Sequence, residues 1–424
     1  MIDVKVLREN PKEVKAGIAA KKATDNVDEI LSLDERRREL IKEADDLKSK
    51  RNTASKRIGE LKREKKDAQP AIDKMKETSD AIKRLDDELR EVDAKFHELL
   101  LAVPNLPHYT APEGTSEKDN VEKKQWLPKG FSLEDDREYL DHVELGKRLG
   151  ILDFERGAKI AGAGFPLYVG KGARLERALL NFMIDLHLEK HGYEEVMTPF
   201  LANPESMTGT GQLPKMADDM YRIDRDDLYL IPTAEVPITN IHRDEILDEA
   251  RLPISYCGYS PCFRREAGSY GKDTRGFLRV HQFNKVEMVK FVKPEDSGEA
   301  LQNLVNDAED VLRALDIPYR VIELCAADLS FAAAKCFDIE TWSPGEKKWL
   351  EASSCSNFLD FQARRASIRY RSADGKPEFV HTLNGSGLAT SRLMVSLLER
   401  HQTSDGGVRV PEPLRDYAGF DVID

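Results

Sequence analysis

Two arginines, two glutamates and a phenylalanine stand close together in the middle of the chain, at spacings that could bind a charged aromatic ligand. Two strand-like runs, YCGYSPCFRREAG and FLRVHQFNKVEMVKFV, flank a Gly-rich charged loop, which predicts a β-hairpin. Side chains alternate across a strand, so Arg279, Phe283 and Glu287 share one face, as do Arg264 and Glu266 on the first run. Arginine offers a planar fork to phosphate or carboxylate, phenylalanine a face for a purine, and glutamate an acceptor for an amino group.

The opposite face of this hairpin is apolar. Leu278, Val280, Val286 and Met288 alternate with the charged residues, so we expect the sheet to be packed from behind. A solvent-exposed face with cross-strand ion pairs is the plain alternative. A packed back and a charged front are more typical of the floor of a pocket, and we predict a pocket here.

The elements around the hairpin indicate an α+β fold. Several strand-like runs follow one another without a helix between them, which favours an antiparallel sheet flanked by helices over a doubly wound parallel sheet. Helical periodicity occurs at 137–150, 173–191, 297–315 and 387–401, and strand-like alternation at 193–200, 228–232, 255–266, 277–292, 318–324, 354–361 and 379–383.

The first hundred residues have a different pattern. Over 30–61 the apolar residues step by three and four alternately, with Arg37 and Arg51 in the seam, and a second such seam covers 71–99. Pro70 lies in the break between them. Neither helix is apolar enough to be buried on all sides, so we predict an antiparallel coiled-coil hairpin that projects as an arm.

The charge of the chain is unevenly distributed. It has 65 Lys+Arg and 77 Asp+Glu, a net charge of −12, which taken alone disfavours a nucleic-acid partner. Residues 1–100, however, have a net charge of +1 and the remainder a net charge of −13. Within 48–66 there are nine basic side chains and only two acidic ones. A solvated coiled-coil surface is the plain interpretation, but a local basic concentration also suits a polyanion.

Composition and missing motifs exclude other classes of protein. The 424 residues suffice for two or three domains, without an apolar run of membrane-spanning length or a signal-peptide core. There is no P-loop, and the five cysteines lack both a Cys-x-x-Cys pair and zinc-ligand spacing. We therefore expect a cytoplasmic protein without disulfides.

Five ordered stretches, with the arm, resemble the class II aminoacyl-tRNA synthetases, specifically the seryl-tRNA synthetase family, over essentially the whole chain. The loop of motif 2 in this family, here with Lys272, Asp273 and Arg275, approaches the acceptor end of tRNA. The matching stretches are motif 1 (172–199), 233–235, motif 2 (263–266 and 276–287), 351–358 and motif 3 (383–392).

The resemblance implies ATP-dependent activation of L-serine to seryl-adenylate, followed by transfer of serine to the 3′ end of tRNA. It implies that Arg264 and Arg392 are the catalytic residues, that Phe283 stacks on adenine, and that Glu351 and Ser354 hold Mg²⁺. The full ATP-binding set that it implies is Arg264, Arg265, Glu266, Arg279, Val280, Phe283, Glu351, Ala352, Ser353, Ser354 and Arg392.

For the amino acid, the resemblance implies a pocket with several hydrogen-bond acceptors. The ammonium and hydroxyl of serine both need acceptors, and an alanine would leave them unpaired, which gives strong rejection. Threonine would be rejected only by the space for one methyl group, the weaker filter. The implied serine-binding residues are Thr233, Ala234, Glu235, Glu287, Asn384 and Ser386.

The resemblance also implies partners and domains. We expect a homodimer with an N-terminal tRNA-binding domain at 1–103, its hairpin at about 28–100, a linker at 104–136 and a class II catalytic domain at 137–424. The arm would grip the long variable arm of serine tRNA, and of selenocysteine tRNA in an organism that has one. The arm residues expected to bind tRNA are Lys48, Arg51, Lys56, Arg57, Lys62 and Arg63.

Two residues depart from the family pattern. Ser391 precedes Arg392 where the family usually has glycine, which narrows the room beside the arginine, and Ala352 stands where valine is commoner.

Two alternative functions would require different sequence features. A ligase that loads an amino acid on a carrier protein would lack the long arm and would use cysteine ligands for zinc. An inactive RNA-binding paralogue would not be expected to retain the charged pocket residues.

Overall fold

The computed structural model describes residues 1–134, 137–267 and 275–424 and divides into two compact units. Unit 1 covers Met1–Pro104 and unit 2 covers Asn105–Asp424. Within the described residues, none of the helices combines the length and the apolar character that crossing a membrane requires.

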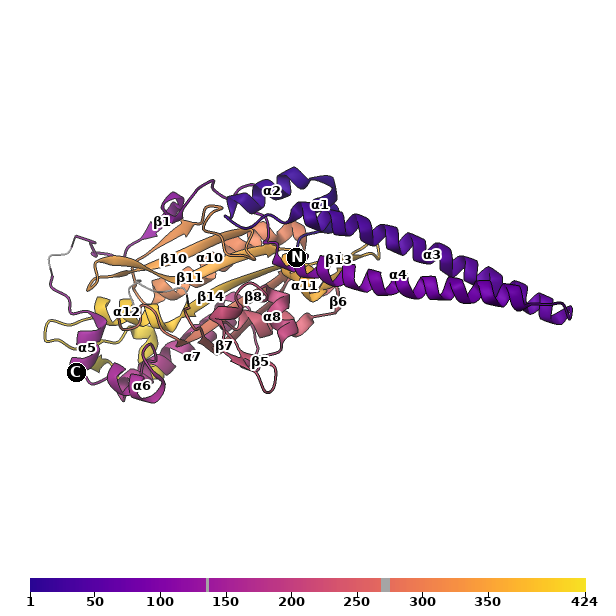
Figure 1. Cartoon of the computed structure of the whole chain (residues 1–424). Helices are drawn as coiled ribbons and strands as arrows, with labels where there is room; N and C mark the ends of the chain where they lie inside the picture. The colour runs from indigo at the N-terminus through magenta and orange to yellow at the C-terminus, as the bar shows by residue number, and fades with distance from the viewer. Residues whose placement is uncertain (135–136, 268–274) are drawn as a thin grey trace. The chain divides into compact units, whose positions relative to one another are not determined.

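Unit 1 contains the predicted arm. Helices α3 (Val27–Arg63) and α4 (Gln69–Ala102) lie side by side (Figure 1), and Pro70 stands in the first turn of α4, where its missing N–H is tolerated. Arg37, near the start of α3, pairs with Asp93, near the end of α4, so the helices are antiparallel. The seam arginine therefore forms an ion pair across the hairpin. Two short helices precede the arm, α1 (Val4–Glu9) and α2 (Pro11–Ala20).

Unit 2 is built on an eight-stranded sheet, which confirms the predicted α+β class. Neighbouring strands are antiparallel except for one parallel pair at an edge, β2 beside β7. In order across the sheet the strands are β1 (Val121–Trp126), β9 (Tyr319–Glu323), β10 (Lys335–Ser343), β11 (Lys348–Leu359), β14 (His381–Ala389), β8 (Gln282–Val292), β7 (Ile254–Phe263) and β2 (Glu194–Glu195). The smaller sheets pair β3 (Leu201–Ala202), β5 (Leu228–Leu230) and β4 (Arg222–Ile223); β13 (Pro377–Phe379), β12 (Arg369–Arg371) and β6 (Ile246–Asp248); and β15 (Val408–Arg409) with β16 (Val422–Ile423).

Part of the linker expected at 104–136 is instead strand β1 of the large sheet. It pairs antiparallel with β9, and Lys124 Nζ donates a hydrogen bond to the buried carboxylate of Glu309 at 2.6 Å. The sequence VEKKQW lacks apolar alternation because the strand lies at the sheet edge with its side chains largely exposed. The pattern on which strand prediction depends is therefore absent.

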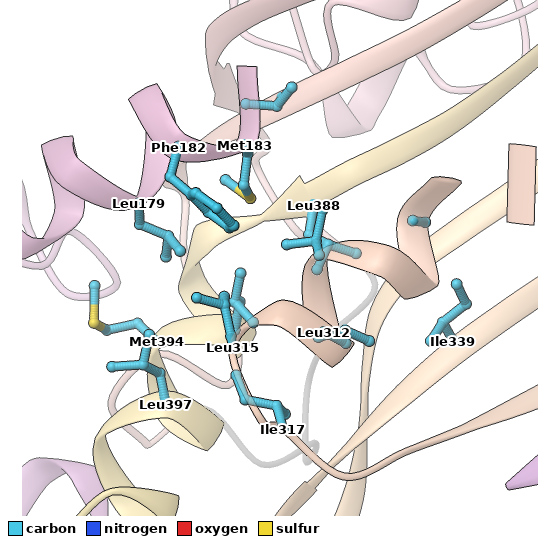
Figure 2. Close-up of a cluster of buried hydrophobic side chains, with 14 of the residues drawn as sticks. Leu179, Phe182, Met183, Leu312, Leu315, Ile317, Ile339, Leu388, Met394 and Leu397 are labelled. Carbon is cyan, nitrogen blue, oxygen red and sulfur yellow. The ribbon is translucent and has the colours of Figure 1, made fainter. Parts of the chain in front are cut away.

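Three helices pack against one face of the sheet and form its main core (Figure 2). Leu179 comes from α7, Leu312 from α10 and Met394 from α12. Val286 and Met288 of β8 belong to the same core, so the prediction of a sheet packed from behind is confirmed for this strand. Leu278 and Val280 belong to the core as well, but they come from the segment that precedes β8. The helices of unit 2 are α5 (His142–Arg148), α6 (Phe154–Ala161), α7 (Lys171–His191), α8 (Pro204–Thr210), α9 (Glu235–Thr239), α10 (Ser297–Ala314), α11 (Phe361–Ala366), α12 (Thr390–Arg400) and α13 (Arg415–Ala418).

Two predicted boundaries are wrong near the pocket. Residues 277–281 form turns and bends rather than a strand, and 387–389 continue β14 rather than begin a helix. Gly387 lies directly against His187, and a Cβ there would come within 2.4 Å of His187 Nε2. The same nitrogen contacts the carbonyl of Gly387 at 2.9 Å, within the stretch between Ser386 and Ala389 where the pairing of β14 with β8 is irregular.

Candidate active site

A cavity of about 600 Å³ opens on the face of β8 opposite to the main core. Its floor comes from β8, β11 and β14, and it is closed on one side by the segments that follow β5 and β7. Most of the predicted site residues line it: Thr233, Glu235, Arg264, Glu266, Arg279, Val280, Phe283, Glu351, Ala352, Ser353, Ser354, Asn384, Ser386 and Arg392.

Three predicted residues do not line the cavity. Glu287 is fully buried directly beneath it, and Ala234 is buried in the turn before α9. Arg265 is exposed, and its guanidinium donates to the carbonyl of Asp218 at 3.2 Å. Glu287 is therefore linked to the cavity by hydrogen bonds to Thr233 and Asn384, which line it. Arg265 remains outside the cavity.

One end of the cavity combines cations with an aromatic ring. The guanidinium carbon of Arg264 lies 5.2 Å from the ring centroid of Phe283, and Arg264 Nε donates to the carbonyl of Pro232 at 3.3 Å. Arg279 forms an ion pair with Glu266. A planar cation stacked on an aromatic ring can bind phosphate and a flat base together.

Arg392 closes this end from the start of α12. It is the third residue of the helix, and its Nη1 donates to the carbonyl of Glu351 at 2.8 Å and lies 3.3 Å from the Glu351 carboxylate. An arginine in the first turn of a helix adds to the positive end of the helix dipole, which favours a bound anion. The prediction that Arg392 stands near a helix N-terminus is confirmed.

The other end of the cavity holds two carboxylates from different strands and turns. Asn384 donates one amide hydrogen to Glu287 Oε1 at 2.9 Å and the other to Glu235 Oε2 at 3.1 Å. Thr233 Oγ1 donates to Glu287 Oε2 at 2.9 Å. The amide thus bridges two negative groups that would otherwise repel each other.

Burial and the neighbouring charge of Glu287 raise the pKa of Glu235 to about 7. Gln362, on α11, opposes this shift by donating to Glu235 Oε1 at 2.6 Å. Glu235 is therefore poised to gain or lose a proton near neutral pH, and a bound cation would favour its ionised form.

Sequence reasoning missed two residues of this end. Lys285 is buried, pairs with Glu287 and donates to Thr233 Oγ1 at 2.9 Å. The alternation that selected Phe283 and Glu287 also selects Lys285, which lies between them, so this signal was available. Gln362 comes from a helix without any motif, and nothing in the sequence indicated it.

Four consecutive residues of β11, 351–354, line the cavity, although a regular strand would turn every second side chain away. The register between β10 and β11 shifts here, because Ile339 pairs with Ser353 but Glu340 pairs with Glu351. This bulge explains the continuous lining.

The arm of unit 1 carries the predicted basic residues on α3. Lys56, Arg57, Lys62 and Arg63 are exposed, whereas Arg51 is half-buried. Half-buried Lys48 pairs with Asp86 of α4 at 2.9 Å, and the exposed Arg57 pairs with Glu60 at 3.0 Å. The outer half of α3 therefore presents a cationic surface.

Comparisons with known proteins agree with this geometry. A model of the seryl-tRNA synthetase N-terminal domain matches residues 1–107, and one of the class II tRNA synthetase core domain (G, H, P, S and T) matches 220–401. A serine--tRNA ligase from Chloroherpeton thalassium is 60% identical over 428 residues and is matched over the full length of both chains. The chain belongs to the seryl-tRNA synthetase family.

Two solved seryl-tRNA synthetases have the same fold over the full chain. The enzyme from Pyrococcus horikoshii, crystallised with ATP, superposes with a TM-score of 0.92 at 39% identity, covering 100% of this chain and 99% of its own. The cytoplasmic enzyme from Naegleria fowleri, in complex with AMP, gives 0.86 at 33% identity with the same coverage. The family, the α+β fold and the N-terminal arm predicted from the sequence are confirmed.

The departure from the family pattern at 390–391 has a definite structure. Thr390 turns away from the cavity and donates to Glu176 at 2.6 Å, while the largely buried Ser391 lines the cavity. Arg392 nevertheless reaches Glu351, so serine in place of glycine leaves the arginine at the cavity. Lys272 and Asp273 lie outside the described residues, and Arg275 pairs with Asp141 at 2.8 Å.

The chemistry of Glu351 and Ser354 fits Mg²⁺ only in part. Both offer oxygen to the cavity, and the Glu351 side chain is 49% exposed. Asp338, on β10, hydrogen-bonds to Ser354, and burial together with the Glu351 charge raises its pKa. Among the described residues no group of three or more His, Cys, Asp or Glu could hold a metal, so a Mg²⁺ here needs further oxygens from a ligand or from water.

Proposed function

We propose that this chain is a serine--tRNA ligase: it activates L-serine with ATP to seryl-adenylate and pyrophosphate, then transfers serine to the 3′ end of serine tRNA. The observation that carries the proposal is a single cavity with a cationic, aromatic end and an acidic end, in a chain 60% identical to a serine--tRNA ligase over its full length.

The test is ATP–pyrophosphate exchange with each of the twenty amino acids. We expect exchange with serine alone, and subsequent charging of serine tRNA. Absence of exchange with every amino acid would refute the proposal and would favour an inactive RNA-binding paralogue. Exchange without tRNA charging, but with loading of a carrier protein, would favour the carrier-protein ligase.

For ATP we propose that Arg264 holds the α-phosphate while Phe283 stacks on adenine. Glu266 meets the adenine amino group, and its ion pair with Arg279 orients its carboxylate. Arg392 stabilises the charge on the phosphates. The serine carboxylate then attacks the α-phosphate and pyrophosphate leaves, without a covalent enzyme intermediate, so catalysis rests on positioning and charge stabilisation. Val280, Ala352 and Ser353 shape the wall of the adenosine pocket, and Arg265, which lies outside the cavity, holds the Asp218 segment through its hydrogen bond to the Asp218 carbonyl.

For serine we propose that the ammonium binds at Glu235 and Thr233 and the hydroxyl at Glu287. Two buried carboxylates and one buried lysine leave one negative charge, which the serine ammonium balances. Ser386 and Asn384 complete the pocket, and buried Ala234 supports the turn that carries Glu235. Alanine lacks the hydroxyl and would leave buried acceptors unpaired, which is strongly unfavourable.

We propose that Glu351 and Ser354 would hold Mg²⁺ together with phosphate oxygens of ATP. When bound, the ion supplies positive charge that offsets charge on the phosphates. Arg392 lies beside Glu351 and would share this task.

We propose that unit 1 binds the long variable arm of serine tRNA through Lys48, Arg51, Lys56, Arg57, Lys62 and Arg63, and of selenocysteine tRNA in an organism that has one. The cationic surface of α3 supports this, because phosphate contacts supply most of the affinity for nucleic acid. The N-terminal domain at 1–103 and the catalytic domain at 137–424 remain the proposed functional division.

We further propose a homodimer that forms through motif 1, which comprises α7 and the segment after it. Met197, 84% exposed, is an apolar side chain in this segment that a second copy would cover. We also propose a cytoplasmic location, since all five cysteines are free, as expected in a reducing compartment.

A further inference from the structure

Glu176 of α7 is a buried carboxyl group that the proposed reaction does not use. Only 6% of the residue is exposed, and no Lys, Arg or His side chain pairs with it among the described residues. Its Oε1 accepts hydrogen bonds from Asn284 Nδ2 at 2.8 Å and from Thr390 Oγ1 at 2.6 Å. Burial raises the pKa of Glu176. A buried acid held only by neutral donors needs an explanation, since it is costly to keep.

Three neutral side chains hydrogen-bond to Glu176: Asn284, Thr390 and Tyr168. Of these, Asn284 and Thr390 are sequence neighbours of residues that line the ATP end of the cavity. Asn284 directly follows Phe283 on β8, and its Oδ1 accepts from the Tyr259 hydroxyl of β7 at 3.2 Å. The Asn284 amide is therefore fixed from both sides. The backbone that carries the Phe283 ring is in this way tied to α7.

Thr390 ties the backbone near Arg392 to Glu176, as Asn284 does for the backbone of Phe283. It is the first residue of α12, two positions before Arg392, and its hydroxyl lies 3.0 Å from the carbonyl of Asn284 as well as 2.6 Å from Glu176. One carboxyl group thus joins the motif 1 helix, the motif 2 strand and the start of the motif 3 helix.

The Phe283 ring packs against the main core and lies under Arg264, but it also has open space beside it. A second cavity of about 120 Å³ lies beside it, lined by Phe283, Asn284, Ser391 and Tyr168 among others. Phe283 and Ser391 line both this cavity and the large one. A ring with open space beside it depends on its backbone for its position, and Glu176 constrains that backbone.

We propose that Glu176 is a positioning residue for ATP: it locks Asn284 and Thr390, and through them sets the places of Phe283 and Arg392. This inference rests on the proposed function, because it presupposes that these two residues contact the nucleotide.

The test is ATP–pyrophosphate exchange by the full-length protein with E176L, E176Q and T390V. E176L removes the acceptor of two hydrogen bonds, so we expect the KM for ATP to rise about tenfold, with kcat and the serine KM within about twofold of wild type. E176Q retains the acceptor oxygen and should restore the ATP KM to within about twofold of wild type. T390V removes one donor and should give an intermediate rise. Titration calorimetry with ATP alone should reproduce the order of the variants.

E309L is the matched control, because Glu309 is equally buried but its partners, Lys124 and Arg313, lie outside both cavities. We expect E309L to lower the melting temperature without raising the ATP KM. If E309L raises it as E176L does, or if E176L and T390V leave it unchanged, the proposal is overturned. Should E176L not fold, T390V decides alone. A wild type without any exchange would instead refute the proposed function.

Discussion

At the scale of single residues, the serine end of the cavity depends on a balance of charges. Glu235 and Glu287 are both buried, and Lys285 is the buried cation that pairs with Glu287. Asn384 bridges the two carboxylates. The pocket therefore needs one more positive charge when both acids are ionised, and under the proposed function the ammonium group of serine would supply it.

Replacing Lys285 with methionine should abolish this balance. Removing one member of a buried ion pair costs about 3 kcal/mol or more of stability, so the melting temperature should fall. Because the Glu287 carboxylate would also lose the cation that fixes its position, kcat/KM for serine should fall about 100-fold. The ATP KM should change little, since Lys285 lies at the other end of the cavity. Exchange kinetics with varied serine measure the effect.

The matched control is K290M on the same strand, where Lys290 pairs with Asp307 at 3.3 Å and does not line the cavity. An equal loss of serine kcat/KM in K285M and K290M would contradict the role given to Lys285.

The pKa of Glu235, about 7, predicts a pH dependence. The folded-state pKa is raised, so the protonated form is favoured in the free enzyme below this value, and its ionisation is needed to bind the serine ammonium. At saturating ATP, kcat/KM for serine should therefore rise with pH through a midpoint near 7. The same sign means that Glu235 contributes stability at acid pH that is lost as the pH rises through about 7.

The E235Q variant separates the titration of Glu235 from the titration of ATP. ATP titrates equally in assays of the wild type and of the variant, so a difference between their pH profiles belongs to Glu235. The variant should bind serine weakly, and its profile should lack the step near 7. An unchanged step in E235Q would assign the pH dependence to another group.

At the scale of elements, strand alternation predicted much of the site but not all of it. It correctly placed Phe283 in the lining of the cavity, Glu287 beneath it in contact with Asn384 and Thr233, and Val286 in the core. It missed β10, which carries Asp338 beside Ser354, and it missed the bulge in β11. A bulge is set by pairing with a neighbouring strand, and its local sequence carries no period that would reveal it.

The roles of single residues came from the resemblance rather than from periodicity. No pattern in the sequence placed Gln362 next to Glu235 or Thr390 next to Glu176, because these contacts join segments 127 and 214 residues apart. Local propensity carries little information on such long-range contacts. The arm was the easiest element to predict, because its helices follow a regular seam with Pro70 at the turn.

Deleting residues 28–100 tests the arm as an element. The proposed function places adenylate formation in the cavity of unit 2, so serine-dependent exchange should stay within about threefold of wild type, while tRNA charging should fall by about 100-fold or more. A milder variant removes 49–85, the part of the hairpin beyond the Lys48–Asp86 ion pair, and should act in the same direction. Full charging by either variant would refute the role of the arm.

At the scale of the whole molecule, the negative net charge does not indicate whether the chain binds nucleic acid. The total is −12, yet residues after the first hundred carry −13 and the segment 48–66 carries a local excess of seven positive charges. Under the proposed function, the acidic remainder would disfavour indiscriminate polyanion binding, while the basic surface of α3 would attract tRNA locally. Affinity for nucleic acid should therefore depend on where the positive charges lie rather than on how many there are.

Charge reversal on the two arm helices tests this directly. Changing Lys56, Arg57, Lys62 and Arg63 to glutamate should weaken tRNA binding and flatten its dependence on salt, since each phosphate contact contributes about 0.9 to the slope of log K against log salt. The same four reversals on α4, at Lys74, Lys76, Lys83 and Arg84, which are also exposed, alter the net charge equally and should alter the slope much less. Filter binding of serine tRNA over a range of salt concentrations measures both slopes. Because the two variants have the same net charge, equal slopes would mean that total charge governs binding and would contradict a localised tRNA surface on α3.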